Sequence, residues 1–284
     1  MKIAFIGGGN MATALIAGLS KEKGTGVQVH VVDPNPEALE KMASQFGATT
    51  ATAIDAAVAA CELVVLAVKP QQMREVATAL APRLGAGPVV LSIAAGIRSA
   101  DLARWLGGYG AIVRAMPNTP ALIGMGITGM VATSGVSDTQ RAAADGVMRA
   151  VGKTVWLDSE DLIDPVTAVS GSGPAYVFYF LEAMQAASVE MGLSAEQGKE
   201  LALATFAGAA ELAARSPESL EVLRQRVTSK GGTTYAAITS MEGSGVKAAI
   251  VEAMKAAAAR GRELGDELGR ISPPGQECQA FAGD

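Results

Sequence analysis

The sequence predicts an α/β fold in which an N-terminal domain built on a parallel sheet is followed by an all-α domain. Three observations predict it. Short apolar runs alternate with helical patterns over the first half of the chain, a glycine turn directly follows the first run, and strand-like runs become rare after Pro174. We expect the sheet domain over residues 1–163, the helical domain over residues 164–270 and a mobile tail over residues 271–284.

The composition indicates a protein with a substantial core and no surface for nucleic acid. Of 284 residues, 49% are hydrophobic, the net charge is -5, and no block of Lys and Arg stands out. Cys61 and Cys278 lie far apart without a pairing motif, which favours reduced thiols in a cytoplasmic protein. The N-terminus does not resemble a signal peptide, and no apolar run is long enough for a membrane span.

The individual elements follow from periodicity and turn residues. Apolar runs predict strands over residues 2–6, 27–33, 62–68, 89–94 and 111–115. Helical patterns cover residues 36–46, 174–191, 195–215, 218–227, 233–242 and 246–268, and another runs from the glycine turn to Leu19. The helix over 174–191 is apolar nearly all round, which indicates burial in a core or a subunit interface. The acidic stretch over residues 158–165 has no companion metal ligands, so we interpret it as a solvated connection between the domains, and we predict no metal site.

The glycine turn predicts a Rossmann-type dinucleotide site. Gly7, Gly9 and Ala12 form G-x-G-x-x-A between a strand and a helix, where the glycines permit a tight turn and close approach to a pyrophosphate. Asp33 ends the second strand, where a carboxylate accepts hydrogen bonds from a ribose 2′-OH and repels a 2′-phosphate, so it favours NADH. The single histidine, His30, lies inside that strand, and we interpret it as structural.

Further turns at the carboxyl ends of strands complete the predicted cofactor site, although ordinary loop or helix-start geometry would also explain each of them. The predicted cofactor-binding residues are Gly7, Gly8, Gly9, Asn10, Met11, Ala12, Asp33, Ala67, Val68, Lys69, Pro70, Ala94, Ala95, Gly96, Pro117, Asn118, Gly171 and Gly173. We expect NADP(H) or NAD(H) to occupy this site.

Five segments together resemble the pyrroline-5-carboxylate reductase family. They are GGGNMA from Gly7, AVKPQ from Ala67, RAMPNTPA from Arg114, VSGSGPAYVF from Val169 and TSKGGTT from Thr228. The resemblance covers roughly residues 1–268. It implies hydride transfer from NAD(P)H to the cyclic imine 1-pyrroline-5-carboxylate, giving L-proline in the last step of proline biosynthesis. It also implies a homodimer that interlocks through the helical domain, with decamers common. The family usually favours NADPH and often has a small polar residue where this chain has Asp33.

The substrate carboxylate is expected at a second glycine-rich turn. Such a turn at the start of a helix presents several backbone N–H groups to an anion, although an ordinary helix cap would look the same. Lys230 adds charge there or is a solvated surface lysine. The predicted substrate-binding residues are Asn118, Ser229, Lys230, Gly231, Gly232 and Thr233. The resemblance implies that the Thr234 side chain lies near the ring nitrogen as hydrogen-bond partner and proton relay, which makes it the predicted catalytic residue.

Two other functions remain as alternatives. A β-hydroxyacid dehydrogenase shares this domain order but uses a catalytic lysine in a G-x-G-x-x-x-K pattern, and Val177 occupies that lysine position here. A non-catalytic dinucleotide-binding regulator would keep the first glycine turn but would have no need of the second. A cofactor-oxidation assay with the cyclic imine separates the reductase from the regulator.

Overall fold

The computed structural model describes residues 1–21, 26–85 and 87–270. Contacts divide the chain into two compact units. Among the described residues, the sheet unit contains those of Met1–Gly171 and of Ala257 to Arg270, and the helical unit contains Ser172–Ala256. The sequence predicted a single boundary between the domains, after residue 163. The two units have two boundaries, one after Gly171 and one after Ala256, inside the last helix. The expected mobile tail lies outside the described residues.

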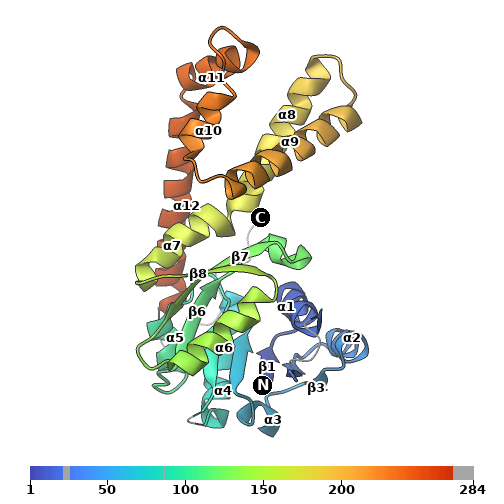
Figure 1. Ribbon diagram of the computed structural model, residues 1–284. Coiled ribbons are helices and arrows are strands. Elements are labelled where there is room, and N and C mark those ends of the chain that lie inside the picture. Colours follow the sequence, from blue (N-terminus) through green and yellow to red (C-terminus); the bar gives the residue numbers. More distant parts are fainter. Residues whose placement is uncertain (22–25, 86, 271–284) are drawn as a thin grey trace, which may run out of the picture. The chain divides into compact units, whose positions relative to one another are not determined.

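The sheet unit is built on a mixed sheet with strand order β3-β2-β1-β4-β5-β6-β7-β8 (Figure 1). All neighbouring strands are parallel except β6 and β7, which are antiparallel. The strands are β1 (Lys2–Ile6), β2 (Gln28–Val32), β3 (Thr49–Ala51), β4 (Leu63–Leu66), β5 (Val89–Ser92), β6 (Ile112–Met116), β7 (Gly126–Ala132) and β8 (Gly152–Trp156). This sheet, followed by helices, confirms the predicted fold class.

The helices of this unit cover both faces of the sheet. They are α1 (Asn10–Lys21), α2 (Pro36–Phe46), α3 (Ala56–Ala59), α4 (Met73–Leu80), α5 (Ser99–Trp105), α6 (Asp138–Arg149) and α7 (Ile163–Val166). Short 3-10 turns are η1 (Pro70–Gln72), η2 (Ala81–Arg83), η3 (Thr119–Ile123) and η4 (Glu160–Leu162), and η5 (Thr167–Gly171) is a π-helical turn. Pro36 occupies the first turn of α2 as predicted, and Asn35 caps that helix.

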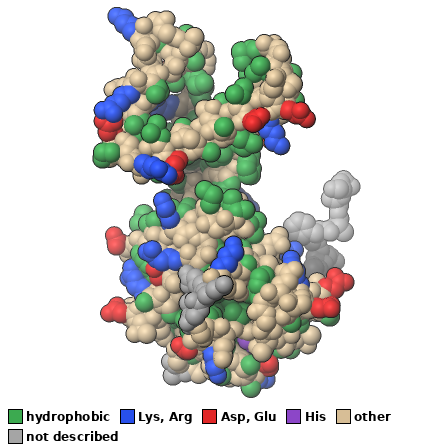
Figure 2. Space-filling view, turned by 45° about the vertical axis from the view of Figure 1, so that its right-hand side comes forward, with side chains coloured by type: hydrophobic (Ala, Val, Ile, Leu, Met, Phe, Trp, Pro, Cys, Tyr) green, Lys and Arg blue, Asp and Glu red, His purple; other side chains and the backbone are tan. Residues whose placement is uncertain are grey.

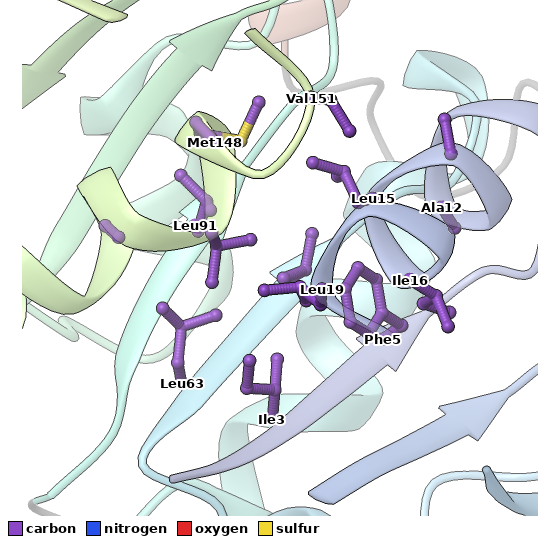
Figure 3. Close-up of a cluster of buried hydrophobic side chains, with 14 of the residues drawn as sticks. Ile3, Phe5, Ala12, Leu15, Ile16, Leu19, Leu63, Leu91, Met148 and Val151 are labelled. Atoms are coloured by element: carbon purple, nitrogen blue, oxygen red, sulfur yellow. The ribbon is translucent and has the colours of Figure 1, made fainter. Parts of the chain in front are cut away.

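Successive side chains of a strand point to opposite faces of the sheet, and each face has its own hydrophobic core. Ile3 and Phe5 of β1 point to one face, where they pack with α1, α2 and α6 (Figure 3). Ala4 and Ile6 point to the other face, which α3, α4 and α5 cover. Because successive strand residues face opposite sides, a strand buried on both faces is apolar at every position. This explains why the strands of the sheet centre are continuous apolar runs in the sequence.

The helical unit contains the elements expected after Pro174. They are α8 (Gly173–Glu190), α9 (Ala195–Arg215), α10 (Leu220–Arg226), α11 (Thr233–Gly243) and the first part of α12 (Val246–Gly269). Ser194 and Gln197 form a capping box at the start of α9. Inside the unit α8 packs along α9, with the rings of Phe180 and Phe206 6.4 Å apart. None of the described helices combines the length and apolarity needed to cross a bilayer.

Much of the surface of α8 is exposed in the single chain. Phe178 is 60% exposed and Tyr179 is 73% exposed in the single chain. Figure 2 shows hydrophobic side chains gathered on the surface of the helical unit. Of the two expected environments, a core and a subunit interface, the core within one chain is therefore wrong for this face of the helix. Large apolar side chains in water favour an interface.

The acidic stretch over residues 158–165 is largely exposed to solvent, as expected, but it also has a structural function. It forms η4 and the start of α7, and Ile163 is buried. Glu160 accepts a hydrogen bond at 2.8 Å from the buried Arg114 of β6 and another at 2.8 Å from the N–H of Ser99 at the start of α5. One carboxylate therefore neutralises a guanidinium inside the fold and satisfies a free helical N–H group.

Replacing Glu160 by Gln is expected to lower the free energy of unfolding by about 1–3 kcal/mol. The loss is smaller than that for a fully buried pair because the Glu160 side chain is 31% exposed. Urea denaturation measures it. The neighbouring exposed Asp161→Asn serves as the control, and its stability should change by no more than about 0.5 kcal/mol. Equal stability of the two variants would contradict this role of Glu160.

Candidate active site

The first glycine turn joins β1 to α1 at the carboxyl edge of the sheet. Gly7 has a φ of +103°, and a Cβ there would lie 2.7 Å from the carbonyl oxygen of Ala67. A Cβ at Gly9 would meet nothing within 4 Å, and Gly9 and Asn10 are exposed. The buried Ala12 packs α1 against the sheet. At Gly7 the turn is thus packed against the protein backbone, whereas at Gly9 it has free space beside it. Free N–H groups at the start of α1 can bind a phosphate there.

Gly7→Ala is expected to destabilise the protein and to abolish dinucleotide binding. The new methyl group would require a strained φ and would overlap the Ala67 carbonyl, which together cost at least about 2 kcal/mol. Thermal unfolding and NADH titration by fluorescence measure the two effects. Gly9→Ala is the matched comparison, since its methyl group has free space in the protein and should affect ligand binding more than stability. Stable folding with normal NADH binding in Gly7→Ala would contradict the expectation.

Asp33 is bonded to the turn itself. Its Oδ2 accepts a hydrogen bond from the Gly8 N–H at 2.7 Å, and its Oδ1 accepts one from the Asn35 N–H at 2.8 Å. The carboxylate therefore joins the glycine turn to the start of α2. Each carboxylate oxygen can accept a further bond, so these contacts leave room for a ribose hydroxyl. Asp33 has a structural function here in addition to the predicted contact with the cofactor.

A pocket of about 500 Å³ lies beside these residues, at the carboxyl ends of β1, β2 and β4. Predicted residues that line it are Gly7, Gly9, Asp33, Ala67, Val68 and Lys69. Gln72, Glu75 and Val76 also line it and were not among the predicted residues, although they follow Lys69 closely in sequence. The pocket has two carboxylates, Asp33 and Glu75, against one cation, Lys69. This lining fits a neutral ribose better than a 2′-phosphate.

In the turns after β5 and β6, packing and backbone hydrogen bonds account for residues that were predicted to contact a ligand. Gly96 has a φ of +73°, and a Cβ there would lie 3.0 Å from Leu268 of α12, so packing explains this glycine without a ligand. Ala94 and Pro117 are buried. Asn118 is 9% exposed, and within the described part of the chain its side chain bonds to two backbone groups. The predicted ligand contacts of these turns remain predictions.

The glycines before α8 differ from each other. A Cβ at Gly171 would lie 2.7 Å from the side chain of Met116, so this glycine lets η5 pack against the end of β6. A Cβ at Gly173 would meet nothing within 4 Å, and Pro174 lies in the first turn of α8 as predicted. A π-helical turn is frequent at functional sites. Gly171 and Gly173 remain predicted, untested contacts of the cofactor.

The second glycine-rich turn lies in the helical unit, at the start of α11. Gly231 has a φ of +77°, and the Gly232 N–H donates to the Ser229 carbonyl at 2.9 Å. Gly232 is the N-cap residue of α11 and makes no side-chain cap. Ser229, Lys230, Thr233 and Thr234 are exposed. The start of this 11-residue helix therefore has N–H groups without a capping side chain beside three exposed hydroxyl side chains, an arrangement that suits an anion.

The histidine and one of the cysteines do not line the pocket beside the first glycine turn. His30 is buried in β2, with Nδ1 2.9 Å from the Thr49 hydroxyl and Nε2 3.2 Å from Asp55. Cys61 is a free, buried thiol whose pKa is raised mainly by that burial. Cys278 lies outside the described residues. The contacts of His30 are those of a structural histidine.

The fold and the site together define a nicotinamide-dinucleotide-dependent oxidoreductase. A family described as NADP oxidoreductase, coenzyme F420-dependent, matches residues 2–96, and one described as pyrroline-5-carboxylate reductase dimerisation matches residues 160–264. The chain is 46% identical to a pyrroline-5-carboxylate reductase of Pseudomonas aeruginosa, covering 95% of this chain and 98% of the relative. It therefore belongs to the pyrroline-5-carboxylate reductase family.

Solved structures agree with this assignment. A pyrroline-5-carboxylate reductase from Coxiella burnetii superposes with a TM-score of 0.87 at 38% identity, covering 92% of this chain and 97% of that one. A pyrroline carboxylate reductase from Plasmodium falciparum with NADP bound gives a TM-score of 0.81 at 28% identity, covering 93% and 98%. Structures of other dehydrogenases at 17% identity or less share only the fold.

Proposed function

We propose that this chain reduces 1-pyrroline-5-carboxylate to L-proline, with the glycine turn at Gly7–Ala12 binding the dinucleotide and the turn at Ser229–Thr234 binding the substrate. Family membership supports the reaction, and the open N–H groups at both turns support the assignment of the two binding sites. When bound, the dinucleotide supplies the hydride. The protein must align the reactants, exclude water and bind the carboxylate.

Reduction of an imine requires less of the protein than reduction of a ketone. The ring nitrogen can already carry a proton, which makes the adjacent carbon electrophilic, so a histidine is not needed as general acid. We assign Ser229, Gly231, Gly232 and Thr233 to the carboxylate, because their N–H and hydroxyl groups match its acceptors. The Thr234 hydroxyl is assigned to the ring nitrogen, where it can hold or pass on one proton.

The cofactor assignment is NADH or NADPH, with NADH preferred. The preference rests on the carboxylates of Asp33 and Glu75 in the pocket beside the glycine turn. The experiment that tests the function is a steady-state assay of the purified chain, in which oxidation of NADH and of NADPH is followed with and without the cyclic imine. Oxidation that depends on the imine and yields proline supports the reductase. Dinucleotide binding without such turnover would favour the regulator.

The assembly is a homodimer, which the family match over residues 160–264 and the exposed apolar side chains of α8 both support. We further propose that dimers associate into decamers and that the protein is cytoplasmic. Light scattering of the purified protein gives the assembly size. Its cysteine usage supports the location, because Cys61 is a buried, unpaired thiol.

A further inference from the structure

Asn118 follows β6 directly, and its side chain supplies an acceptor for a backbone N–H of β7 beyond the paired residues of the two strands. β6 and β7 pair in antiparallel register up to Met116 and Gly129. Pro117 has no N–H and cannot continue the ladder. Beyond it, the Asn118 Oδ1 accepts a hydrogen bond from the N–H of Ile127 in β7 at 3.0 Å. The amide side chain thus extends the sheet past the proline.

The NH₂ group of the same amide donates to the carbonyl of Ser170. This carbonyl has no helical donor, because the residue four positions on is Pro174. Asn118 Nδ2 donates to the carbonyl oxygen of Ser170 at 3.1 Å. In a helix that carbonyl would accept from the residue four positions on, which is Pro174 and has no N–H. The next N–H, that of Ala175, already donates to Ser172 at 3.0 Å. Since a partly buried carbonyl without a donor is costly, the Asn118 amide stabilises the π-helical turn η5.

We propose that Asn118 is a positioning residue for hydride transfer, and that its side chain serves the protein backbone rather than the substrate or the cofactor. It fixes the segment Pro117–Pro120 at the carboxyl edge of the sheet to η5, the turn that ends at Gly171. The contact of Gly171 with Met116 holds the same two segments together independently. This inference rests on the proposed function, because the carboxyl edge is where the dinucleotide is expected.

Three variants separate positioning from ligand contact. Asn118→Asp keeps an acceptor for the Ile127 N–H but places a carboxylate oxygen against the Ser170 carbonyl. Asn118→Ala removes both bonds. Ser170→Ala is the control, because Asn118 bonds the backbone of residue 170 and not its hydroxyl, which donates to the Val166 carbonyl. Each variant is assayed for kcat, for KM of the imine and for NADH affinity by fluorescence, and amide hydrogen exchange reports on the Ile127 N–H.

We expect kcat to fall by about ten- to a hundredfold in Asn118→Asp and in Asn118→Ala, with NADH affinity within about twofold of the parent chain. Exchange at Ile127 should quicken in Asn118→Ala and stay slow in Asn118→Asp. Ser170→Ala should match the parent chain within about twofold in kcat.

A kcat near the parent value in Asn118→Asp would overturn the proposal. So would a loss of NADH or imine affinity in step with kcat, which would make Asn118 a ligand contact. Failure of both Asn118 variants to fold would also overturn it, because the residue would then serve stability alone. If the parent chain does not reduce the imine, the proposed function fails instead, while the exchange and NADH measurements still test the two hydrogen bonds.

Discussion

Replacing Thr234 by Ala is expected to lower kcat/KM for the cyclic imine by about ten- to a hundredfold and to leave NADH affinity nearly unchanged. The reason is the hydrogen bond assigned between the Thr234 hydroxyl and the ring nitrogen. Thr234 is exposed in the first turn of α11, so the substitution removes no packing and should not destabilise the helix. Steady-state kinetics and NADH fluorescence titration measure the two quantities.

Two further variants make this experiment specific. Thr234→Ser keeps the hydroxyl and should retain most of the activity. Thr239→Ala is the same substitution at an exposed position further along the same helix, and it should have kinetics like those of the parent chain. Unchanged kinetics in Thr234→Ala would remove this residue from the site. An equal loss of kcat/KM in Thr239→Ala would show that the effect comes from a change in the α11 helix and not from the Thr234 hydroxyl.

Asp33→Ser is expected to raise the ratio of kcat/KM with NADPH to kcat/KM with NADH by about tenfold or more. Removing the carboxylate removes its repulsion of a 2′-phosphate and its contact with a ribose hydroxyl. The same change removes the acceptors of the Gly8 and Asn35 N–H groups, so activity with NADH should fall in absolute terms as well. Kinetics with both cofactors at equal ionic strength give the ratio.

Glu75→Gln is the matched control for Asp33→Ser. It removes one negative charge from the lining of the same pocket without touching the glycine turn. We expect a smaller change in the cofactor ratio from Glu75→Gln. An unchanged ratio in Asp33→Ser would refute the selectivity assigned to Asp33, and equal changes in both variants would show that the total charge of the pocket sets the preference.

Features with a local cause were predictable from the sequence. The helical pattern of α9 predicted its bounds, residues 195–215, as the structure has them. Pro36 marked the start of α2 in the same way. The strands β3, β7 and β8 were not predicted. β3 has only three residues, and β7 contains two glycines, so neither forms a distinct apolar run. The antiparallel pairing of β6 with β7 likewise left no pattern to detect.

The same distinction holds for the candidate site. The glycine turn and Asp33 were predictable because strand, turn and helix are contiguous there. The bonds of Asn118 to Ser170 and of Arg114 to Glu160 join residues far apart in sequence, and no spacing rule reveals them. Signals for them did exist. Pro174 leaves the Ser170 carbonyl without a helical donor, and an arginine inside a buried strand requires a carboxylate.

The exposed rings of α8 have a consequence for how firmly the chain stays folded. Phe178 and Tyr179 are exposed to water in the single chain. Burying them in a subunit interface stabilises the folded dimer, and an isolated subunit lacks this stabilisation. The melting temperature should therefore rise with protein concentration, and dilution alone should weaken the fold. Replacing the largely exposed Tyr179 would therefore alter thermal stability mainly through the contact between subunits.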